Sequence, residues 1–269
     1  GCGLMALLAE FEVIRPHSIE EAAQAAAGDD TSFIAGGTDM IPGLRRGLGE
    51  PQTLIDLSCV ASLDQIEVSE TALRVGAGVT LQQLISSPVI QADYKVIADA
   101  AETIAGTTHR HSATVGGNLC LDTRCQFYNQ SQWWRSANNY CLKYRGDLCH
   151  VANNSKVCLA AYSGDLAPAM LLHNARVELV SAQGKRSIAL SELYREDGAN
   201  SLTLAPGELL VAVVLEKLNN YRCAYRKVRV RGGIDFPLVG VAMAVRGSES
   251  HLEDIRVAVT GTNSRPLVI

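Results

Sequence analysis

AGTTHRHSATVGGNLC (residues 105–120) and YSGDLAP (residues 162–168) bound the segment around which this chain is organised. The first stretch is crowded with small residues and carries the adjacent pair Gly116–Gly117. Backbone without bulky side chains lets N–H groups approach a ligand closely. Half of the eight cysteines lie between the two stretches, at Cys125, Cys141, Cys149 and Cys158. The pattern predicts a backbone cradle for a cofactor, interrupted by a four-thiolate metal site, and both features indicate electron transfer.

The composition is that of a globular protein. The 269 residues suffice for one large domain or two of ordinary size. Apolar residues make up 47% and charged residues 19%, without a disordered or fibrous bias. The formal net charge is −4 and no basic stripe stands out, which argues against nucleic acid and anionic membrane as partners. No run of about 18 apolar residues occurs, so we expect no segment to span a bilayer.

The start of the chain and the cysteines indicate the compartment. GCGLMALLAEF at residues 1–11 has no basic region and soon reaches Glu10, so we expect no signal peptide. Eight cysteines without an export signal favour a reducing environment, in which thiols bind metal or stay free. We therefore predict a cytoplasmic protein.

Residues 1–60 are predicted to form a first subdomain. A capping box at Ser18–Glu21 begins an alanine-rich helix. A short strand at Thr31–Ile34 then breaks into the loop Ala35–Asp39, with sequence AGGTD, and the aspartate is expected to cap the next helix. The strand Thr53–Leu57 closes a small βαβ-like unit. This order of strand, glycine turn and helix is typical of an anion nest for a phosphate.

Residues 61–172 are predicted to form a second subdomain, interrupted by an insertion at 121–162. The run Leu73–Gly78 is expected to be a strand that enters a turn, and Thr80 is expected to cap a short amphipathic helix. Another helix is predicted over Tyr94–Ile104, because its apolar residues recur at helical spacing.

Residues 173–269 are predicted to form an antiparallel C-terminal domain, which makes the fold class α+β. The strand-like runs are 176–180, 185–190, 209–215, 224–231, 239–245 and 255–259. The first two flank a short turn and resemble a hairpin. The set predicts an antiparallel meander with a domain boundary near residue 173. No helix follows to cover the last sheet, so we expect this domain to be incomplete.

Two glycine loops carry the cofactor prediction, Ala35–Asp39 and Thr114–Asn118. Neither is G-x-G-x-x-G, so a Rossmann nicotinamide site is not indicated. Each loop follows an apolar run and carries polar residues, so the pair forms either a diphosphate cradle or two ordinary turns. Asp165 opens the DLAP run, where an N-cap role and an acceptor role toward a ribose hydroxyl are compatible.

The central cysteines follow the spacing C-x15-C-x7-C-x8-C. Thiolates are soft ligands, and four of them suit structural zinc or an iron–sulfur cluster. The tight knuckles of zinc ribbons are lacking, and unligated core thiols are the third alternative. Cys120, in the glycine loop, is a fifth candidate ligand. The aromatic residues of the segment either form its own small core or shield a cluster from water; they include Tyr128, Trp133, Trp134, Tyr140 and Tyr144.

The histidines carry less information. His109 and His111 flank an arginine before the second glycine loop, where one of them would meet a phosphate or a flavin ring. His150 adjoins Cys149 and is an alternative ligand. A solvated or hydrogen-bonded imidazole is the simpler interpretation of each. The chain shows no Ser/His/Asp order, no H-E-x-x-H and no P-loop, so no self-contained hydrolytic machinery is indicated.

AGGTD, ATVGGN and GDLAP, followed by an antiparallel module, resemble the FAD-binding medium subunits of the molybdenum hydroxylase (xanthine oxidase) family over nearly the whole chain. The resemblance implies a two-part FAD-binding domain of that type, termed PCMH-like, with the diphosphate on the two glycine loops and the aspartate of GDLAP toward the adenosine. It implies FAD contacts from Ala35, Gly36, Gly37, Thr38, Asp39, Thr108, His109, Ala113, Thr114, Gly116, Gly117, Asn118 and Asp165. Looser implied contacts are Leu210, Lys227, Asp235 and Phe236.

The insertion resembles that of the 4-hydroxybenzoyl-CoA reductase branch, whose extra loop carries a 4Fe–4S cluster. The similar runs are NLCLDTRCQFYNQ (118–130), WWR (133–135) and YCLKY (140–144). The resemblance implies that the four central cysteines hold this cluster, that reduced ferredoxin supplies electrons, and that FAD passes them on. It further implies a large partner subunit with the molybdenum cofactor and a small one with 2Fe–2S centres.

By the same resemblance, the whole enzyme converts 4-hydroxybenzoyl-CoA to benzoyl-CoA in anaerobic aromatic degradation, and no residue of this chain is catalytic. Two alternatives remain. One is an ordinary molybdenum hydroxylase flavoprotein with structural zinc in the insertion. The other is a non-enzymatic interaction subunit stabilised by zinc.

Overall fold

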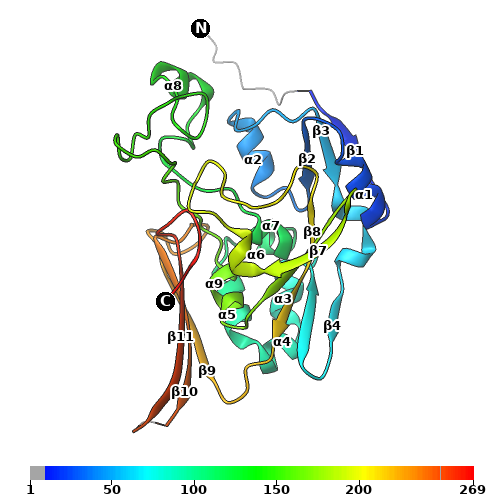
Figure 1. The fold of residues 1–269 in the computed structure, drawn as a ribbon, viewed down its shortest axis with the longest axis vertical. Coiled ribbons are helices and arrows are strands. Elements are labelled where there is room, and N and C mark those ends of the chain that lie inside the picture. The colour runs from blue at the N-terminus through cyan, green and yellow to red at the C-terminus, as the bar shows by residue number, and fades with distance from the viewer. Residues whose placement is uncertain (1–9, 249) are drawn as a thin grey trace.

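The computed structural model describes residues 10–248 and 250–269 (Figure 1). Residues 1–9 lie outside this range, so most of the stretch for which no signal peptide was predicted is not described. Three sheets and a layer of short helices make up the chain, which confirms the predicted α+β class. In the described part of the chain, no helix is both long and apolar enough to cross a bilayer.

A small parallel sheet forms the N-terminal region, with strand order β1-β3-β2. Its strands are β1 (Glu12–Ile14), β2 (Thr31–Ile34) and β3 (Thr53–Asp56), joined by α1 (Ile19–Ala25) and α2 (Met40–Arg45). Two 3₁₀ turns follow at Leu57–Cys59 and Ala61–Leu63. The predicted βαβ-like unit is confirmed, because β2 and β3 pair in parallel.

The predicted capping box at Ser18 is confirmed in part. The Ser18 hydroxyl accepts from the Glu21 N–H, but the Glu21 carboxylate accepts from the N–H of His17 instead of Ser18. The expected cap at Asp39 is wrong, since its side chain makes no capping hydrogen bond at α2.

The second sheet is antiparallel, with strand order β4-β5-β8-β6-β7. Its strands are β4 (Ile66–Val68), β5 (Ala72–Gly76), β6 (Arg176–Ser181), β7 (Gly184–Ala189) and β8 (Leu209–Glu216). The predicted hairpin is confirmed as β6–β7. The single C-terminal meander is wrong, because β8 lies between β5 and β6 and joins both halves of the chain. The sheet therefore crosses the boundary predicted near residue 173.

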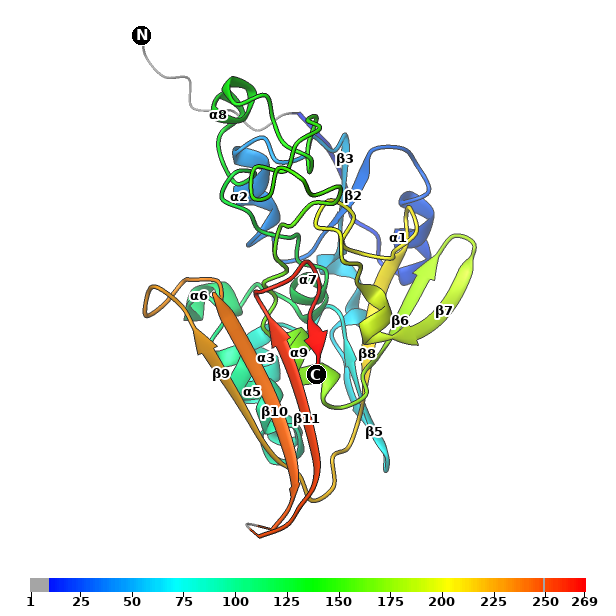
Figure 2. The same cartoon turned by 60° about the vertical axis from the view of Figure 1, so that its left-hand side comes forward.

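The third sheet is also antiparallel, with strand order β12-β11-β10-β9. Its strands are β9 (Arg222–Val228), β10 (Val239–Gly247), β11 (Leu252–Thr260) and β12 (Leu267–Val268). A helical layer lies between the second and third sheets in both views (Figures 1 and 2). It contains α3 (Leu81–Ser86), α4 (Pro88–Asp93), α5 (Lys95–Glu102) and α9 (Leu166–Leu171), with α5 against β9 and α9 against β10 and β11. The main apolar core fills this sandwich.

The remaining helices lie in or next to the parts of the chain that carry the sequence motifs. They are α6 (Thr107–Arg110), α7 (Val115–Leu119), α8 (Gln132–Ala137) and a 3₁₀ turn at Leu190–Leu193. The insertion with α8, drawn in green, lies near α2 and far from most of the third sheet (Figures 1 and 2). The Arg135 side chain, only 1% exposed, ties α8 to the loop after α2 by donating to the Gly47 carbonyl at 2.6 Å.

Candidate functional site

A cavity of about 600 Å³ opens between the N-terminal sheet, α7 and the loop joining β9 to β10. This volume lies in the usual range for cofactor sites. Thirteen residues implied as FAD contacts line it: Ala35, Gly36, Gly37, Thr38, Asp39, His109, Ala113, Thr114, Gly117, Asn118, Asp165, Asp235 and Phe236. The structure thus brings residues from four distant parts of the chain to one hollow.

The first glycine loop offers free donors to this cavity. Across residues 10–248 and 250–269, no backbone N–H group of residues 36–39 donates to a protein acceptor. The loop also packs closely against the backbone just before the second glycine loop, because a Cβ atom on Gly36 would come within 1.8 Å of the Ser112 carbonyl oxygen. Unpaired N–H groups on a glycine turn form the kind of nest that binds an anion.

The second glycine loop differs from the first, because its glycines lie at the start of helix α7. The Thr114 hydroxyl caps the helix by accepting from the Gly117 N–H at 3.1 Å. The N–H of Gly116 donates to the Ala77 carbonyl at 2.8 Å. Its N–H groups are therefore largely used inside the protein, and this motif shapes the cavity wall more than it supplies donors.

Asp165 does not act as the predicted helix cap. Its carboxylate accepts from the Tyr225 hydroxyl at 2.7 Å and from the Lys227 ammonium at 3.0 Å, and both ion-pair side chains are only 3% exposed. The Asn118 side-chain oxygen instead accepts from the Leu166 N–H at 3.1 Å at the start of α9. Burial raises the pKa of Asp165 and lowers the pKa of Lys227, and their ion pair offsets only part of each effect.

Four implied contacts do not line the cavity. Thr108 is exposed on α6, and Leu210 is buried in the main core on β8. Gly116 faces Ala77, whose Cβ atom would lie 2.8 Å from a Cβ at this position. Lys227 reaches the cavity only through its ion pair with Asp165.

Sequence reasoning missed several charged lining residues, which include Arg46, Asp122, Arg124 and Arg231. Of these, Arg124 contacts two other residues that line the cavity. Its side chain forms an ion pair with Asp39 and lies over the Phe236 ring, with 4.3 Å between the guanidinium carbon and the ring centroid. Burial lowers its pKa to about 10. The only available hint was its position directly before Cys125.

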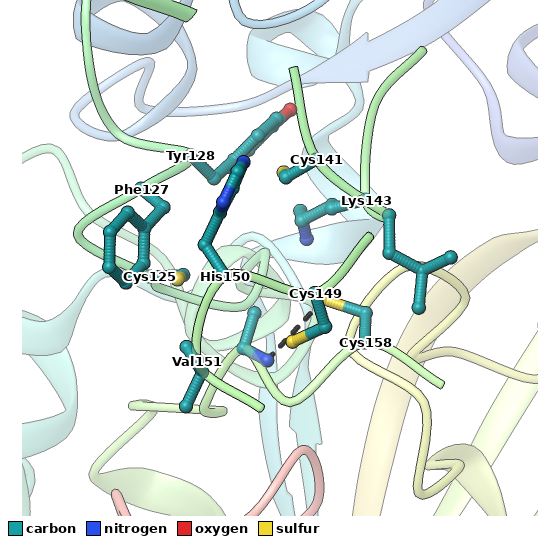
Figure 3. Close-up of a pocket in the computed structure, with 11 residues that line it drawn as sticks. Cys125, Phe127, Tyr128, Cys141, Lys143, Cys149, His150, Val151 and Cys158 are labelled. Carbon is teal, nitrogen blue, oxygen red and sulfur yellow. Dashed lines mark hydrogen bonds between the residues drawn. The ribbon is translucent and has the colours of Figure 1, made fainter. Parts of the chain in front are cut away.

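The four central cysteines line a second, smaller hollow together with Phe127, Tyr128, Lys143, His150 and Val151 (Figure 3). Figure 3 shows Cys125 and Cys141 in different parts of the hollow, whereas Cys149 and Cys158 are drawn close together. Within the described residues, no group of three or more Cys, His, Asp or Glu side chains is placed to hold a single metal ion. The sulfurs thus share one hollow without converging on one ion position.

Hydrogen bonds to sulfur distinguish two of these cysteines. Burial opposes ionisation of Cys149, but backbone N–H groups of Ala152, Leu159 and Val151 donate to its sulfur and lower its pKa overall. The Cys158 sulfur accepts from the Ala160 N–H at 3.4 Å. Cys120 lies apart and lines the larger cavity, where burial raises its pKa to about 12. The His150 Nε2 atom contacts the Tyr140 carbonyl at 2.6 Å.

A cationic side chain packs among the polar groups and aromatic rings of the insertion. The Lys143 ammonium donates to Asp122 and to the Gly198 carbonyl, each at 2.7 Å, and lies 4.9 Å from the Tyr128 ring centroid. Of the aromatic residues expected either to form the insertion's own core or to shield a cluster, Tyr128 is buried and lines the hollow. Trp133 is 77% exposed and fits neither role.

Comparison with known proteins identifies a flavin-binding family over most of the chain. A family described as "FAD binding domain in molybdopterin dehydrogenase" matches residues 9–215. The aldehyde oxidoreductase FAD-binding subunit PaoB of Escherichia coli is 36% identical over 244 residues, which cover 87% of this chain and 75% of that protein. The glyceraldehyde dehydrogenase medium chain of Sulfolobus acidocaldarius is 24% identical over 258 residues, covering 96% and 77%.

Solved structures share the fold. Carbon monoxide dehydrogenase from Hydrogenophaga pseudoflava superposes with a TM-score of 0.78 at 22% identity, covering 97% of this chain and 78% of that one. Quinoline 2-oxidoreductase from Pseudomonas putida gives 0.75 at 22% identity with the same coverage. These likenesses confirm the predicted PCMH-like fold class.

Proposed function

Because this chain belongs to the FAD-binding medium subunits of the molybdenum hydroxylase family, we propose that it is the flavo-iron–sulfur electron-transfer subunit of a molybdenum oxidoreductase. FAD would bind in the 600 Å³ cavity and a 4Fe–4S cluster would bind in the thiol hollow. One observation carries the proposal: Arg124 lines the cavity and the next residue, Cys125, lines the hollow. Two redox groups bound there would be adjacent.

Three features of the cavity fit FAD. The N–H groups of residues 36–39 are free to bind a diphosphate. The Nδ1 atom of His109 is buried and has no partner among the described residues, so a ligand atom would satisfy it. Asp165 lines the wall with a carboxylate held by Tyr225 and Lys227. In this proposal the protein binds and orients the flavin and excludes water, and no residue acts as a general acid or base.

The thiol hollow fits a cluster in its donor chemistry. A 4Fe–4S cluster takes four cysteine thiolates, one on each of four irons, so the sulfurs surround a volume instead of meeting at a point. The four cysteines that line one hollow support this arrangement (Figure 3). N–H donors to Cys149 and Cys158 would also stabilise negative charge on sulfur. When bound, the cluster would supply single electrons, and FAD would store one or two.

The proposed whole enzyme is 4-hydroxybenzoyl-CoA reductase, on the strength of the runs NLCLDTRCQFYNQ and YCLKY in the insertion. Electrons from reduced ferredoxin would pass through this chain to a large molybdenum subunit, together with a small 2Fe–2S subunit. The balanced reaction consumes two electrons and two protons, replaces the phenolic hydroxyl by hydrogen, and releases water. We propose a cytoplasmic site for it.

A second candidate is aldehyde oxidation, with electrons flowing outward from the molybdenum subunit. The observation that favours it is the 36% identity to an aldehyde oxidoreductase subunit over 87% of this chain. The glyceraldehyde dehydrogenase medium chain points the same way. Either candidate uses the same two cofactor sites.

The cofactor proposal is tested by the iron, sulfide, zinc and flavin content of the anaerobically purified chain. We expect one FAD with about four irons and four sulfides per chain. Zinc with flavin and no sulfide would instead establish the structural-zinc alternative, and a colourless protein the non-enzymatic one. The reaction is tested on the co-expressed complex. Dehydroxylation of 4-hydroxybenzoyl-CoA by reduced ferredoxin supports the first candidate, and oxidation of an aldehyde supports the second.

A further inference from the structure

Arg124 is held in place by the backbone around it. Its N–H donates to the Ala161 carbonyl at 2.7 Å, and its carbonyl accepts from the Ala161 N–H at 2.8 Å. This paired bridge joins the two ends of the insertion, directly where the chain enters and leaves it. The position from which the side chain extends is therefore fixed.

The Arg124 side chain extends into the large cavity. It lies over the ring of Phe236 and forms an ion pair with Asp39, the last residue of the first glycine loop. Its Nε atom is buried without a hydrogen-bond partner in the described part of the chain. A buried guanidinium nitrogen without an acceptor is costly, so this geometry calls for an acceptor that the protein itself does not supply.

The carboxylates that line the cavity oppose binding of an anion, so a cation in the cavity matters for holding a diphosphate. Asp39, Asp122 and Asp235 all line this cavity, and their carboxylates by themselves repel an anion. Of the other cationic lining residues, Arg46 is exposed, and Arg231 is engaged by Asp235 and by the Ile234 carbonyl. Arg124 is thus a half-buried cation, with a buried Nε atom, that contacts the first glycine loop through Asp39.

We propose that Arg124 is an FAD-binding residue whose guanidinium contacts the diphosphate, next to the free N–H groups of the first glycine loop. An arginine fork matches two phosphate oxygens and forms strong, charge-assisted hydrogen bonds. The inference rests on the FAD part of the proposed function and is independent of the iron–sulfur cluster. It also places a residue of the insertion in the flavin site.

The test compares Arg124→Gln with Arg145→Gln in the full chain after removal of flavin. Arg145 is a matched control, because it lies in the same insertion but does not line the large cavity, and its side chain is 53% exposed. Its contacts are a 3.9 Å ion pair with Glu50 and a position over the Tyr144 ring, 4.8 Å from the ring centroid. We expect Arg124→Gln to bind both FAD and ADP at least about tenfold more weakly, which corresponds to about 1.4 kcal/mol. Arg145→Gln should bind both as the wild type does. Wild-type FAD affinity in Arg124→Gln overturns the proposal, and so does weakened FAD binding with unchanged ADP binding.

Two further variants separate a direct contact from indirect effects. Arg124→Lys keeps the charge but loses the fork, so FAD binding should be severalfold weaker even if Arg124→Gln does not fold; wild-type affinity in Arg124→Lys counts against the proposal. Asp39→Asn removes the carboxylate that Arg124 neutralises. If Arg124→Gln in this background binds FAD as tightly as Asp39→Asn alone, Arg124 acts only on Asp39 and the proposal fails. A wild-type chain that binds no FAD would instead disprove the proposed function itself.

Discussion

Gly36 lies where two loops that are about 75 positions apart in the sequence come into contact. A Cβ atom there would approach the Ser112 carbonyl oxygen to 1.8 Å and the Ala113 nitrogen to 3.0 Å. Backbone atoms cannot move aside as a flexible side chain does, so one loop would have to shift. The glycine is therefore needed for contact between the loops, in addition to any contact with a ligand.

Replacing Gly36 by alanine should separate the two loops and damage the flavin cavity. We expect loss of bound FAD and destabilisation of about 1–3 kcal/mol, as for other overpacked sites. Flavin absorbance per chain and urea unfolding measure the two effects. Gly232→Ala is the control, because nothing lies within 4 Å of a Cβ atom at Gly232. Full flavin content in Gly36→Ala would show that the loops tolerate separation.

Helices α7 and α9 are coupled by one side chain. Asn118, near the end of α7, accepts from the Leu166 N–H and so caps α9, while it also lines the cavity. The cap comes from 48 residues away in the chain, whereas an ordinary N-cap precedes its own helix directly. The start of α9 therefore depends on the same residue as the cavity wall.

Asn118→Ala should cost about 1 kcal/mol in free energy of unfolding, because the cap on α9 is lost. Asn118→Asp keeps an oxygen acceptor at the same place and should retain most of that stability. It should still lose FAD affinity, because it adds a negative charge to a cavity that binds a diphosphate. Urea unfolding and FAD titration of both variants separate the two roles. Equal stability of wild type and Asn118→Ala would contradict the cap.

A pH-dependent ion pair joins strand β7 of the second sheet to Glu208, the residue directly before β8. Arg186 makes two 2.6 Å hydrogen bonds to Glu208, whose side chain is 5% exposed. The bonds from Arg186 are the main reason that the pKa of Glu208 lies below its ordinary value of 4.5. The pair thus contributes stability above pH 4.5, and this stability is lost as the pH falls through the lowered pKa.

Arg186→Met should destabilise the chain at pH 7 by about 1–3 kcal/mol, since Glu208 is left buried without its partner. The difference from the wild type should shrink as the pH falls below 4.5, because the Glu208 carboxyl becomes protonated as the pH passes through its lowered pKa. Urea unfolding at pH 7 and at a series of acidic pH values provides the measurement. Lys185→Met is the control, because the Lys185–Glu20 pair is 71% and 68% exposed and should contribute little. A difference that grows with acid would refute the assignment.

At the scale of the whole molecule, the thiol hollow and the flavin cavity are adjacent but lined by separate residues. The cysteines of the hollow do not line the cavity, and the glycine loops do not line the hollow. Losing one cofactor should therefore leave the site of the other largely in place.

Cys141→Ser should lower iron and sulfide while FAD stays bound, because Cys141 lines only the hollow. Metal analysis, sulfide assay and flavin absorbance of the anaerobically purified variant check this. Cys223→Ser is the matched control, since Cys223 packs against the main core and lines neither site. Retained iron in Cys141→Ser would count against the ligand assignment.

The sequence by itself determined the local elements and the grouping of the motifs. Capping by Ser18 and Thr80, the β6–β7 hairpin and the strands of the third sheet all depend on residues within a few positions of each other, so local patterns identify them. The four cysteines and the AGGTD loop were also visible directly, and the family resemblance of the motifs indicated which residues we propose to bind FAD.

Only the tertiary structure decided which distant groups meet. In the folded chain, β8 lies between β5 and β6. Asp165 binds Tyr225 and Lys227 instead of capping a helix, and Arg124 lines the large cavity. These contacts join residues far apart in the sequence, 60 positions for Asp165 and Tyr225 and 29 or more for the paired residues of β6 and β8. No local periodicity encodes such pairings. They are set by the packing of the sheets and helices around a shared core, where a buried charge has to find its partner wherever the fold supplies one.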